Sequence, residues 1–170
     1  MERIVHPLKP VYDQNSHVLV LGTMPSPKSR EYGFYYSNPQ NRFWRILADL
    51  FKQPLPKTNV EKRAVLLSCR IALWDVLKSC LIDGADDSSI REPVPNEIAA
   101  LLARTRIHTV FTTGTKAAAL YRRLCLKETG IPAVALPSTS PANCRFYSYE
   151  RLLASYRVLK EAAESSVRLS

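Results

Sequence analysis

The apolar segment HVLVLG at residues 17–22 runs directly into the proline-rich segment TMPSPKSREYGFYYSNPQN at residues 23–41. The first segment is rich in valine and leucine and ends in glycine, a pattern typical of a buried parallel strand. Three prolines and Gly33 predict that the second segment is a long loop. Long ordered loops that follow strands often carry functional groups, so we expect this loop to border the functional site.

Apolar runs and helical patterns alternate along the rest of the chain. This alternation predicts a parallel sheet with helices on both faces. We therefore expect an α/β fold of three layers, α/β/α, around a central, mostly parallel four-stranded sheet. A single domain should span 1–170, with its core at about 15–163. Further strands are expected at 71–77, 108–113 and 131–136, and helices at 43–51, 61–68, 96–104, 116–127 and 149–163.

The place of the functional site follows from this topology. In open parallel sheets, ligands bind beyond the carboxyl ends of the strands. The loop at 23–41 and a second loop, PSTSPAN at 137–143, both leave from those ends, so we expect the site between them. Residues 83–95 are polar and are expected to be irregular, and Asn96 is expected to cap the helix that follows it.

The charge balance indicates a polyanionic partner. Lys and Arg total 24 against 15 Asp and Glu, which gives a net charge of +9. Such a field attracts nucleic acid or an anionic membrane, although the protein could also be merely basic. No segment has the roughly 18 apolar residues that a membrane span needs. The first residues are too polar for a signal peptide, so we expect a cytoplasmic, intracellular protein.

The loop at 23–41 carries side chains that suit nucleic acid. Lys28, Ser29 and Arg30 are candidates for phosphate contacts. The aromatic run at 34–36 is a candidate platform for stacking a base. Asn41 has an amide that can orient water or contact a base. The alternatives are that the aromatic side chains pack in the core and that Asn41 only caps the helix after it.

The second loop offers small polar side chains that suit phosphate contacts, with an arginine just beyond it. The alternative is an ordinary polar turn. The candidate phosphate-contacting residues here are Ser138, Ser140, Asn143 and Arg145.

Familiar catalytic and metal-binding patterns are missing from the sequence. It has no G-x-S-x-G elbow and no P-loop. The four cysteines are scattered and form no C-x-x-C pair, which argues against a zinc or iron–sulfur site. His108 stands at the start of an expected strand, so we expect it to be structural. We therefore expect neither a metal nor an organic cofactor.

Taken together, the two loops resemble the uracil-DNA glycosylase superfamily, and within it the DNA-deoxyinosine (hypoxanthine-DNA) glycosylase branch. The resemblance spans the chain from His17 to about Lys160 and implies a uracil-DNA glycosylase-like fold and a monomer. The segments that carry it are GTMPS at 22–26, NPQNRFW at 38–44, ALWDVLKSC at 72–80, VFTTG at 110–114 and STSPAN at 138–143.

The resemblance assigns roles to residues of the first loop. Met24 stands where relatives that remove uracil or thymine have an Asn that positions the attacking water, and a thioether cannot do this. The resemblance places that catalytic duty on Asn41. Tyr36 falls where an aromatic residue stacks on the base, and the backbone of Thr23 and Met24 would face the base. Asn38 stands at a base-binding position where branch members often have His.

In the second loop, the resemblance gives Ser140 and Asn143 phosphate contacts. Ala142 falls where relatives insert a bulkier wedge into the duplex, so the residue that fills the vacated stack is left open. Asp87 and Ser89 match a polar segment common in the branch, with no role assigned to them.

The resemblance implies a monofunctional DNA glycosylase that acts in base excision repair. It would hydrolyse the N-glycosidic bond of a deaminated base, hypoxanthine first and uracil second, and leave an abasic site. The expected partner is DNA with a damaged base, which would associate the protein with the nucleoid in a prokaryote, and no membrane. Two alternatives stay open. The chain could be a non-catalytic DNA-binding module, which Met24 favours, or a hydrolase of small nucleosides or nucleotides, which would leave the positive charge unexplained.

Overall fold

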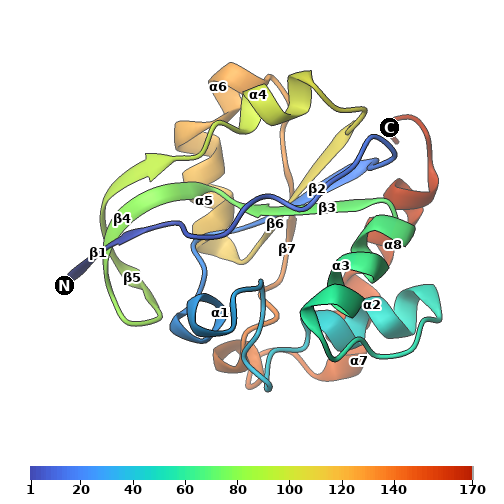
Figure 1. Cartoon of the computed structure of the whole chain (residues 1–170), viewed down its shortest axis with the longest axis horizontal. Helices are drawn as coiled ribbons and strands as arrows, with labels where there is room; N and C mark the ends of the chain where they lie inside the picture. Colours follow the sequence, from blue (N-terminus) through green and yellow to red (C-terminus); the bar gives the residue numbers. More distant parts are fainter. Residues whose placement is uncertain (170) are drawn as a thin grey trace.

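A four-stranded sheet forms the centre of the computed structural model, which describes residues 1–169 (Figure 1). Its strands lie in the order β3-β2-β6-β7, and every neighbouring pair is parallel. The predicted α/β class and the four-stranded parallel sheet are therefore confirmed. The strand bounds are β2 (Val18–Gly22), β3 (Ile71–Asp75), β6 (Thr109–Thr113) and β7 (Val134–Leu136).

Helices cover both faces of this sheet, which completes the three layers (Figure 1). One face carries α4 (Ile98–Ala103), α5 (Thr115–Leu124) and α6 (Leu126–Thr129). The other carries α2 (Phe43–Phe51), α3 (Asn59–Ser68), α7 (Tyr149–Ser155) and α8 (Arg157–Glu164). No helix within residues 1–169 is long and apolar enough to cross a membrane.

The side chains of β2 divide the core between the two faces. Val18 and Val20 belong to the cluster with α2 and α8, whereas Leu19 and Leu21 belong to the cluster with α4 and α5. Successive side chains of a strand point to opposite faces, so a strand that is apolar at every position can only be stable with both faces covered. Because all five positions of β2 are buried, its carboxyl end at Gly22 is held firmly in the core.

A second, antiparallel sheet was not predicted. It consists of β1 (Glu2–Val5), β4 (Leu77–Asp83) and β5 (Asp86–Pro95), in the order β1-β4-β5. The expectation that residues 83–95 are irregular was wrong. Ile90 is the one buried side chain in β5. Pairing of its backbone with β4 therefore defines this strand, and its sequence lacks the alternation of apolar and polar residues by which a strand is recognised.

A short helix interrupts the predicted first loop. It is α1 (Pro27–Tyr32), so the expectation of a loop throughout residues 23–41 was wrong. Ser26 caps the helix by accepting the Ser29 backbone N–H at 3.2 Å, and Gly33 ends it with φ +74°. Proline suits the first turn of a helix, because the missing N–H has no partner there.

Asn96 does not cap α4, contrary to the prediction. The residue at the N-cap position is Glu97, which makes no side-chain cap. The Asn96 amide nitrogen instead donates to the carbonyl oxygens of Asp75 at 2.9 Å and Leu77 at 3.0 Å. The Asn96 side chain therefore holds the chain where β3 ends and β4 begins.

We expect Asn96→Ala to lower the free energy of unfolding by about 2–3 kcal/mol, because it leaves two buried carbonyl groups without donors. Urea denaturation of the variant and the wild type measures the change. Asn59→Ala is a matched control, since the Asn59 amide donates to an exposed carbonyl of Tyr32. Equal stability of the two variants would show that the Asn96 hydrogen bonds contribute little.

Candidate functional site

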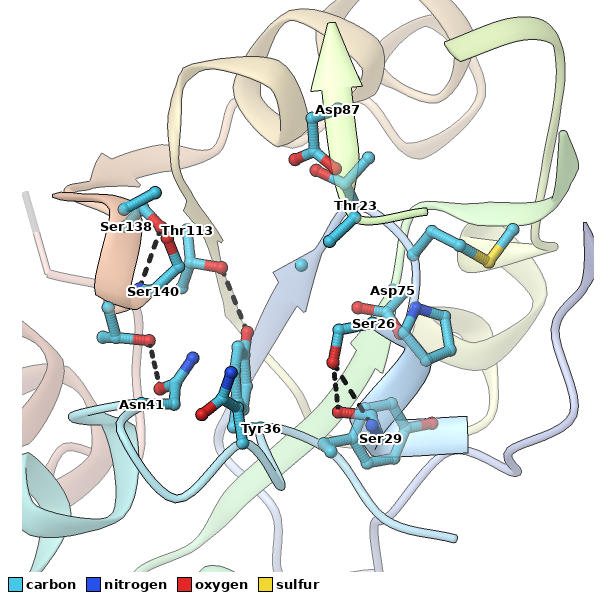
Figure 2. Close-up of a pocket in the computed structure, with 18 of the residues that line it drawn as sticks. Thr23, Ser26, Ser29, Tyr36, Asn41, Asp75, Asp87, Thr113, Ser138 and Ser140 are labelled. Carbon is cyan, nitrogen blue, oxygen red and sulfur yellow. Dashed lines mark hydrogen bonds between the residues drawn. The ribbon is translucent and has the colours of Figure 1, made fainter. Parts of the chain in front are cut away.

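A cavity of about 360 Å³ opens at the carboxyl ends of β2, β3 and β6 (Figure 2). The end of β2 and the segment after it form one part of the wall. Residues 138–142 of the second loop and residues 84–87 of the β4–β5 hairpin form two other parts. The two loops expected to meet at the strand ends therefore do meet there. Of the predicted base-binding residues, Thr23, Met24, Tyr36 and Asn38 all line the cavity, as does Asn41.

The Asn41 amide has a fixed orientation. Its Oδ1 accepts the Phe43 backbone N–H at 2.9 Å and the Thr139 hydroxyl at 2.8 Å. The second bond is the dashed line that ends at Asn41 in Figure 2. A backbone N–H can only donate, so the atom facing it must be the oxygen. Within residues 1–169, Nδ2 has no protein acceptor, and it is free to donate to a ligand in the cavity. Asn41 thus supports the start of α2 and also presents an N–H group.

Contacts between the two loops hold this arrangement. The Arg42 backbone N–H donates to the Thr139 carbonyl at 3.1 Å, and the Arg42 guanidinium donates to the Tyr147 carbonyl at 2.8 Å. Since Thr139 also donates to Asn41, the second loop sets the direction of the amide. The position of Asn41 therefore depends on residues that lie about 100 positions away in the sequence.

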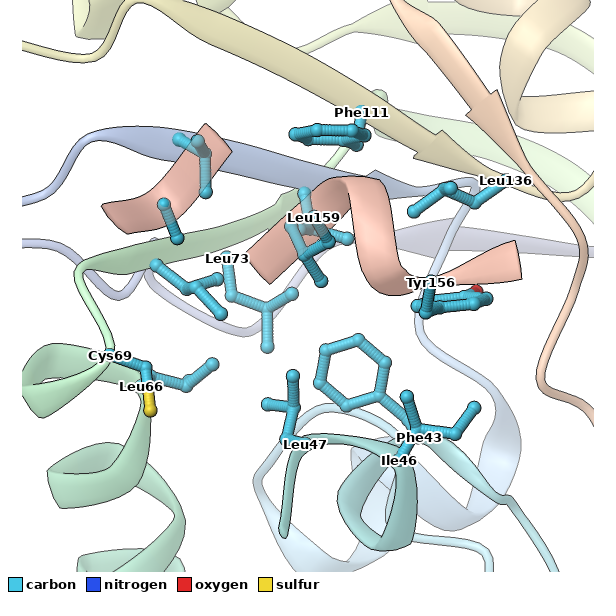
Figure 3. Packing of buried hydrophobic residues seen from close by; sticks show 14 of the residues in the cluster. Phe43, Ile46, Leu47, Leu66, Cys69, Leu73, Phe111, Leu136, Tyr156 and Leu159 are labelled. Atoms are coloured by element: carbon cyan, nitrogen blue, oxygen red, sulfur yellow. The ribbon is translucent and has the colours of Figure 1, made fainter. Parts of the chain in front are cut away.

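The Tyr36 ring stands in the cavity wall with one face against Phe43. The ring centroids are 4.2 Å apart and the planes differ by 20°. Phe43 in turn packs in the core between α2 and α8 (Figure 3). The Tyr36 hydroxyl lies 3.0 Å from the Thr113 hydroxyl. Burial, together with the nearby Asp75 charge, raises the pKa of Tyr36, which stays a neutral phenol.

Asp75 is a site residue that the sequence analysis missed. It ends β3, it is only 4% exposed, and it lines the cavity. Its Oδ2 accepts from His6 Nε2 at 2.8 Å. The Leu8 backbone N–H donates to His6 Nδ1 at 3.2 Å, so Nδ1 carries no proton and the proton of the neutral ring is on Nε2. A polar residue directly after the apolar run at 71–74 was the available signal.

Asp87 lies beside Thr23 at the edge of the cavity (Figure 2). Part of the residue stays open to solvent. Desolvation by the surrounding protein raises the pKa of its carboxyl group, and the nearby Asp75 charge adds to the rise. Both carboxylates therefore lie on the same cavity, one at its base and one at its edge.

The predicted phosphate contacts of the second loop divide into two groups. Ser138 and Ser140 line the cavity, and the Ser138 hydroxyl accepts the Ser140 backbone N–H at 3.1 Å. Asn143 lies outside the cavity wall, where its amide donates to the Ser138 carbonyl at 2.9 Å. Arg145 is exposed outside the cavity, and its guanidinium lies 5.7 Å from the Phe146 ring centroid.

Helix α1 separates the phosphate candidates of the first loop. Ser29 faces the cavity, and its hydroxyl bonds to the Ser26 hydroxyl at 3.1 Å. Lys28 is exposed, 3.9 Å from Glu31, and does not line the cavity. Arg30 does not line it either, and one of its guanidinium nitrogens is buried without a protein partner. The structure therefore brings Ser29 to the cavity but not its two basic neighbours.

Comparison with known proteins connects this site to a family. Residues 9–160 match the family model described as the uracil DNA glycosylase superfamily. The chain is 36% identical over 138 residues to a hypoxanthine DNA glycosylase of Methanosarcina acetivorans, which covers 80% of this chain and 86% of the relative. It is 34% identical over 93 residues to a hypoxanthine DNA glycosylase of Methanosarcina barkeri, covering 54% of this chain and 59% of the relative.

A solved structure has the same fold. It is the solution NMR structure of a candidate uracil DNA glycosylase from Methanosarcina acetivorans. It superposes with a TM-score of 0.80 at 30% sequence identity, covering 94% of this chain and 98% of the other. The family match spans most of the chain and includes both loops that form the cavity. The protein therefore belongs to the uracil DNA glycosylase superfamily.

Proposed function

We propose that this protein is a monofunctional DNA glycosylase. It hydrolyses the N-glycosidic bond of a deaminated base, hypoxanthine in preference to uracil, and leaves an abasic site for base excision repair. The observation that carries the proposal is the Asn41 amide, fixed at the cavity with its N–H group free. The relatives named hypoxanthine DNA glycosylase support the choice of base. We further propose that it acts as an intracellular monomer.

The cavity walls suit a nucleotide that has left the duplex. Flipping costs a few kcal/mol, and a mispaired base costs least. The net charge of +9 favours the DNA backbone. Tyr36, supported from behind by Phe43, offers a ring for the flipped base. The hydroxyl groups of Ser138 and Ser140, which line the cavity, are our candidates for contacts with the flanking phosphates.

Asn41 then acts as a donor. Bond cleavage places positive charge on the sugar and negative charge on the departing base, and a donor aimed at that base lowers the barrier. Asn41 Oδ1 already accepts two hydrogen bonds, so it has no lone pair left for a water proton. Its Nδ2–H can donate to the base or hold the oxygen of the attacking water.

The proposal includes hydrolysis without a covalent intermediate. A lyase step needs an amine nucleophile such as a desolvated lysine. No lysine is among the residues that line the cavity in the described part of the chain, 1–169. Lys28, the one lysine of the first loop, is exposed beside Glu31.

The test uses duplexes that contain one deoxyinosine or one deoxyuridine. We expect release of free hypoxanthine, identified by mass spectrometry, and strand cleavage only after alkali treatment. Salt-sensitive DNA binding without base release would instead establish a non-catalytic DNA-binding module. Release of hypoxanthine from free deoxyinosine, but not from the duplex, would establish a nucleoside hydrolase. Either result would reject the proposal.

Phe146 is the exposed aromatic residue that best suits insertion into the duplex. It is 65% exposed, and it follows closely after Pro141 and Ala142 of the cavity wall. Arg145 lies over its ring, and the Arg151 guanidinium donates to its carbonyl at 3.2 Å. Proteins that flip or kink DNA often place such an apolar side chain between base steps. We propose that Phe146 fills the stack that the base has left.

We expect Phe146→Ala to slow base release from a fully paired duplex about tenfold, and to change release from single strands by less than twofold, because only the duplex has a stack to refill. Single-turnover rates on both substrates measure this. Val60→Ala, another exposed apolar position on α3, is the control. An equal loss on the two substrates would assign Phe146 to general DNA contact.

A further inference from the structure

Asp75 Oδ1 is an atom of the cavity wall that makes no hydrogen bond within residues 1–169, whereas Oδ2 accepts from His6. A Cβ atom built on Gly22 would lie only 2.5 Å from Oδ1 and 3.1 Å from the Tyr36 hydroxyl. Gly22, Tyr36 and Asp75 all line the cavity, so Oδ1 stands at its base, where three strand ends meet (Figure 2).

The groups around Asp75 leave it an acceptor of hydrogen bonds. His6 donates one hydrogen bond from a neutral ring, and no Lys or Arg of residues 1–169 pairs with Asp75. An ionised carboxylate has acceptor lone pairs and no donor. Asp75 lines the cavity, where water can donate to Oδ1, so a base that displaces this water loses affinity unless it brings a donor of its own. The base of the cavity therefore selects a ligand with an N–H group at this point.

Deamination creates such a group on a base. Adenine has an unprotonated N1 and cytosine an unprotonated N3, and each has a lone pair that would face the carboxylate. Hypoxanthine has an N1–H group, and uracil an N3–H group, each beside a carbonyl. A site built to accept an N–H group discriminates strongly against the analogue that lacks it, because the buried acceptor is then left without a partner.

We propose that Asp75 Oδ1 accepts the ring N–H of the flipped base, and that this contact separates deaminated bases from adenine and cytosine. The proposal rests on the proposed glycosylase function. His6 is a positioning residue, because its Nε2–H fixes which carboxylate oxygen faces the cavity. Guanine and thymine also carry a ring N–H group, and their exclusion rests on the cost of breaking a correct base pair.

Asp75 and Asn41 have different roles in the proposed reaction, because one recognises the base and the other assists cleavage of the glycosidic bond. The Asp75 carboxylate repels the negative charge that develops on the departing base. A hydrogen-bond donor on another residue must therefore stabilise that charge. Asn41 provides one, on a different part of the cavity wall from Asp75 (Figure 2). Asp75 thus contributes to the choice of base, and Asn41 to breaking the bond.

The variant Asp75→Asn gives a directional test. The His6 Nε2–H donates, so it holds the oxygen of the new amide and turns the amide nitrogen towards the cavity. A donor then stands where the acceptor was. The hydrogen-bond preference at this point is reversed, and bases with a lone pair on N1 are favoured over bases with an N1–H group.

The experiment compares two duplexes in the same sequence context. One contains deoxyinosine, and the other contains 2′-deoxynebularine, whose purine ring lacks both the N1–H and the O6 of hypoxanthine. We expect the ratio of single-turnover rates, deoxyinosine over deoxynebularine, to fall at least about tenfold in Asp75→Asn. The intrinsic difference between the two glycosidic bonds cancels when the variant ratio is divided by the wild-type ratio.

Asp13→Asn is the matched control, because Asp13 lies outside the cavity and its Oδ1 only accepts the Asn15 backbone N–H. Its ratio should equal that of the wild type. Equal slowing of both substrates by Asp75→Asn, with an unchanged ratio, would overturn the proposal and leave Asp75 a structural role.

A binding measurement keeps the proposal separate from the proposed function. Duplexes with uncleavable 2′-fluorinated versions of the two nucleotides give the same comparison as a ratio of dissociation constants. Suppose that the wild type releases no base but binds the inosine duplex more tightly than the nebularine duplex, and that Asp75→Asn loses this preference. This result would reject the glycosylase function and still support the base contact. Equal binding of both duplexes by wild type would reject the base contact.

Discussion

Replacing Asn41 with alanine is expected to slow base release about 10²–10³-fold while DNA binding survives. The reason is the loss of the Nδ2–H donor, and removing one donor that faces developing negative charge has an effect of this size. Single-turnover rates on a deoxyinosine duplex measure the loss. Fluorescence anisotropy with a duplex that contains an abasic-site analogue measures DNA binding.

The support that Asn41 gives to α2 needs a control of its own. Alanine also removes the acceptor for the Phe43 N–H and the Thr139 hydroxyl, which is expected to cost about 0.5–2 kcal/mol of stability. Asn41→Asp keeps an oxygen in that position and should melt close to the wild-type temperature, but it lacks the N–H donor. Full activity in Asn41→Asp would show that the Nδ2–H donor is not needed for base release.

Gly22→Ala is expected to reduce base release at least about 100-fold. The added methyl carbon would lie 2.5 Å from Asp75 Oδ1, closer than real contacts allow. The carboxylate cannot easily move away, because His6 and the end of β3 hold it. The methyl group also lies 3.1 Å from the Tyr36 hydroxyl, so it crowds a second group of the cavity wall.

This substitution should cost about 1–3 kcal/mol of stability, the usual range for overfilling a packed site. Thermal unfolding gives that value, and activity must be measured well below the melting temperature. Gly130→Ala is a useful comparison, because that glycine has φ +68° and open space around it. It should lose some stability and keep full activity. An active Gly22→Ala enzyme would show that the base does not reach this depth.

Much of the fold could be predicted because its signals are local. The strand at 18–22 is apolar at every position, and the helix at 43–51 has a continuous apolar face, so short stretches of sequence determine both. The place of the cavity followed from one general rule about parallel sheets. Asn41 and Tyr36 were assigned through the family resemblance, and both line the cavity.

The parts that could not be predicted depend on contacts between distant residues. His6 and Asp75 are 69 positions apart, and nothing near either residue indicates the pair. Arg30 was assigned to phosphate by its charge, but the turn of α1 places it outside the cavity wall, and Ser29 faces the cavity instead. The helix breaks at Cys125 and Tyr156 were also missed, because the apolar pattern continues through them.

The β4–β5 hairpin is a part of the cavity wall that can change without disturbing the parallel sheet. Its tip, at Gly84 and Ala85, forms part of the cavity wall but lies outside the parallel sheet. Both residues of the tip are exposed. Changes of length at an exposed tip disturb a core very little. A change in the length of this turn would therefore alter the size of the cavity while the strand ends that carry Gly22, Asp75 and Thr113 stay in place.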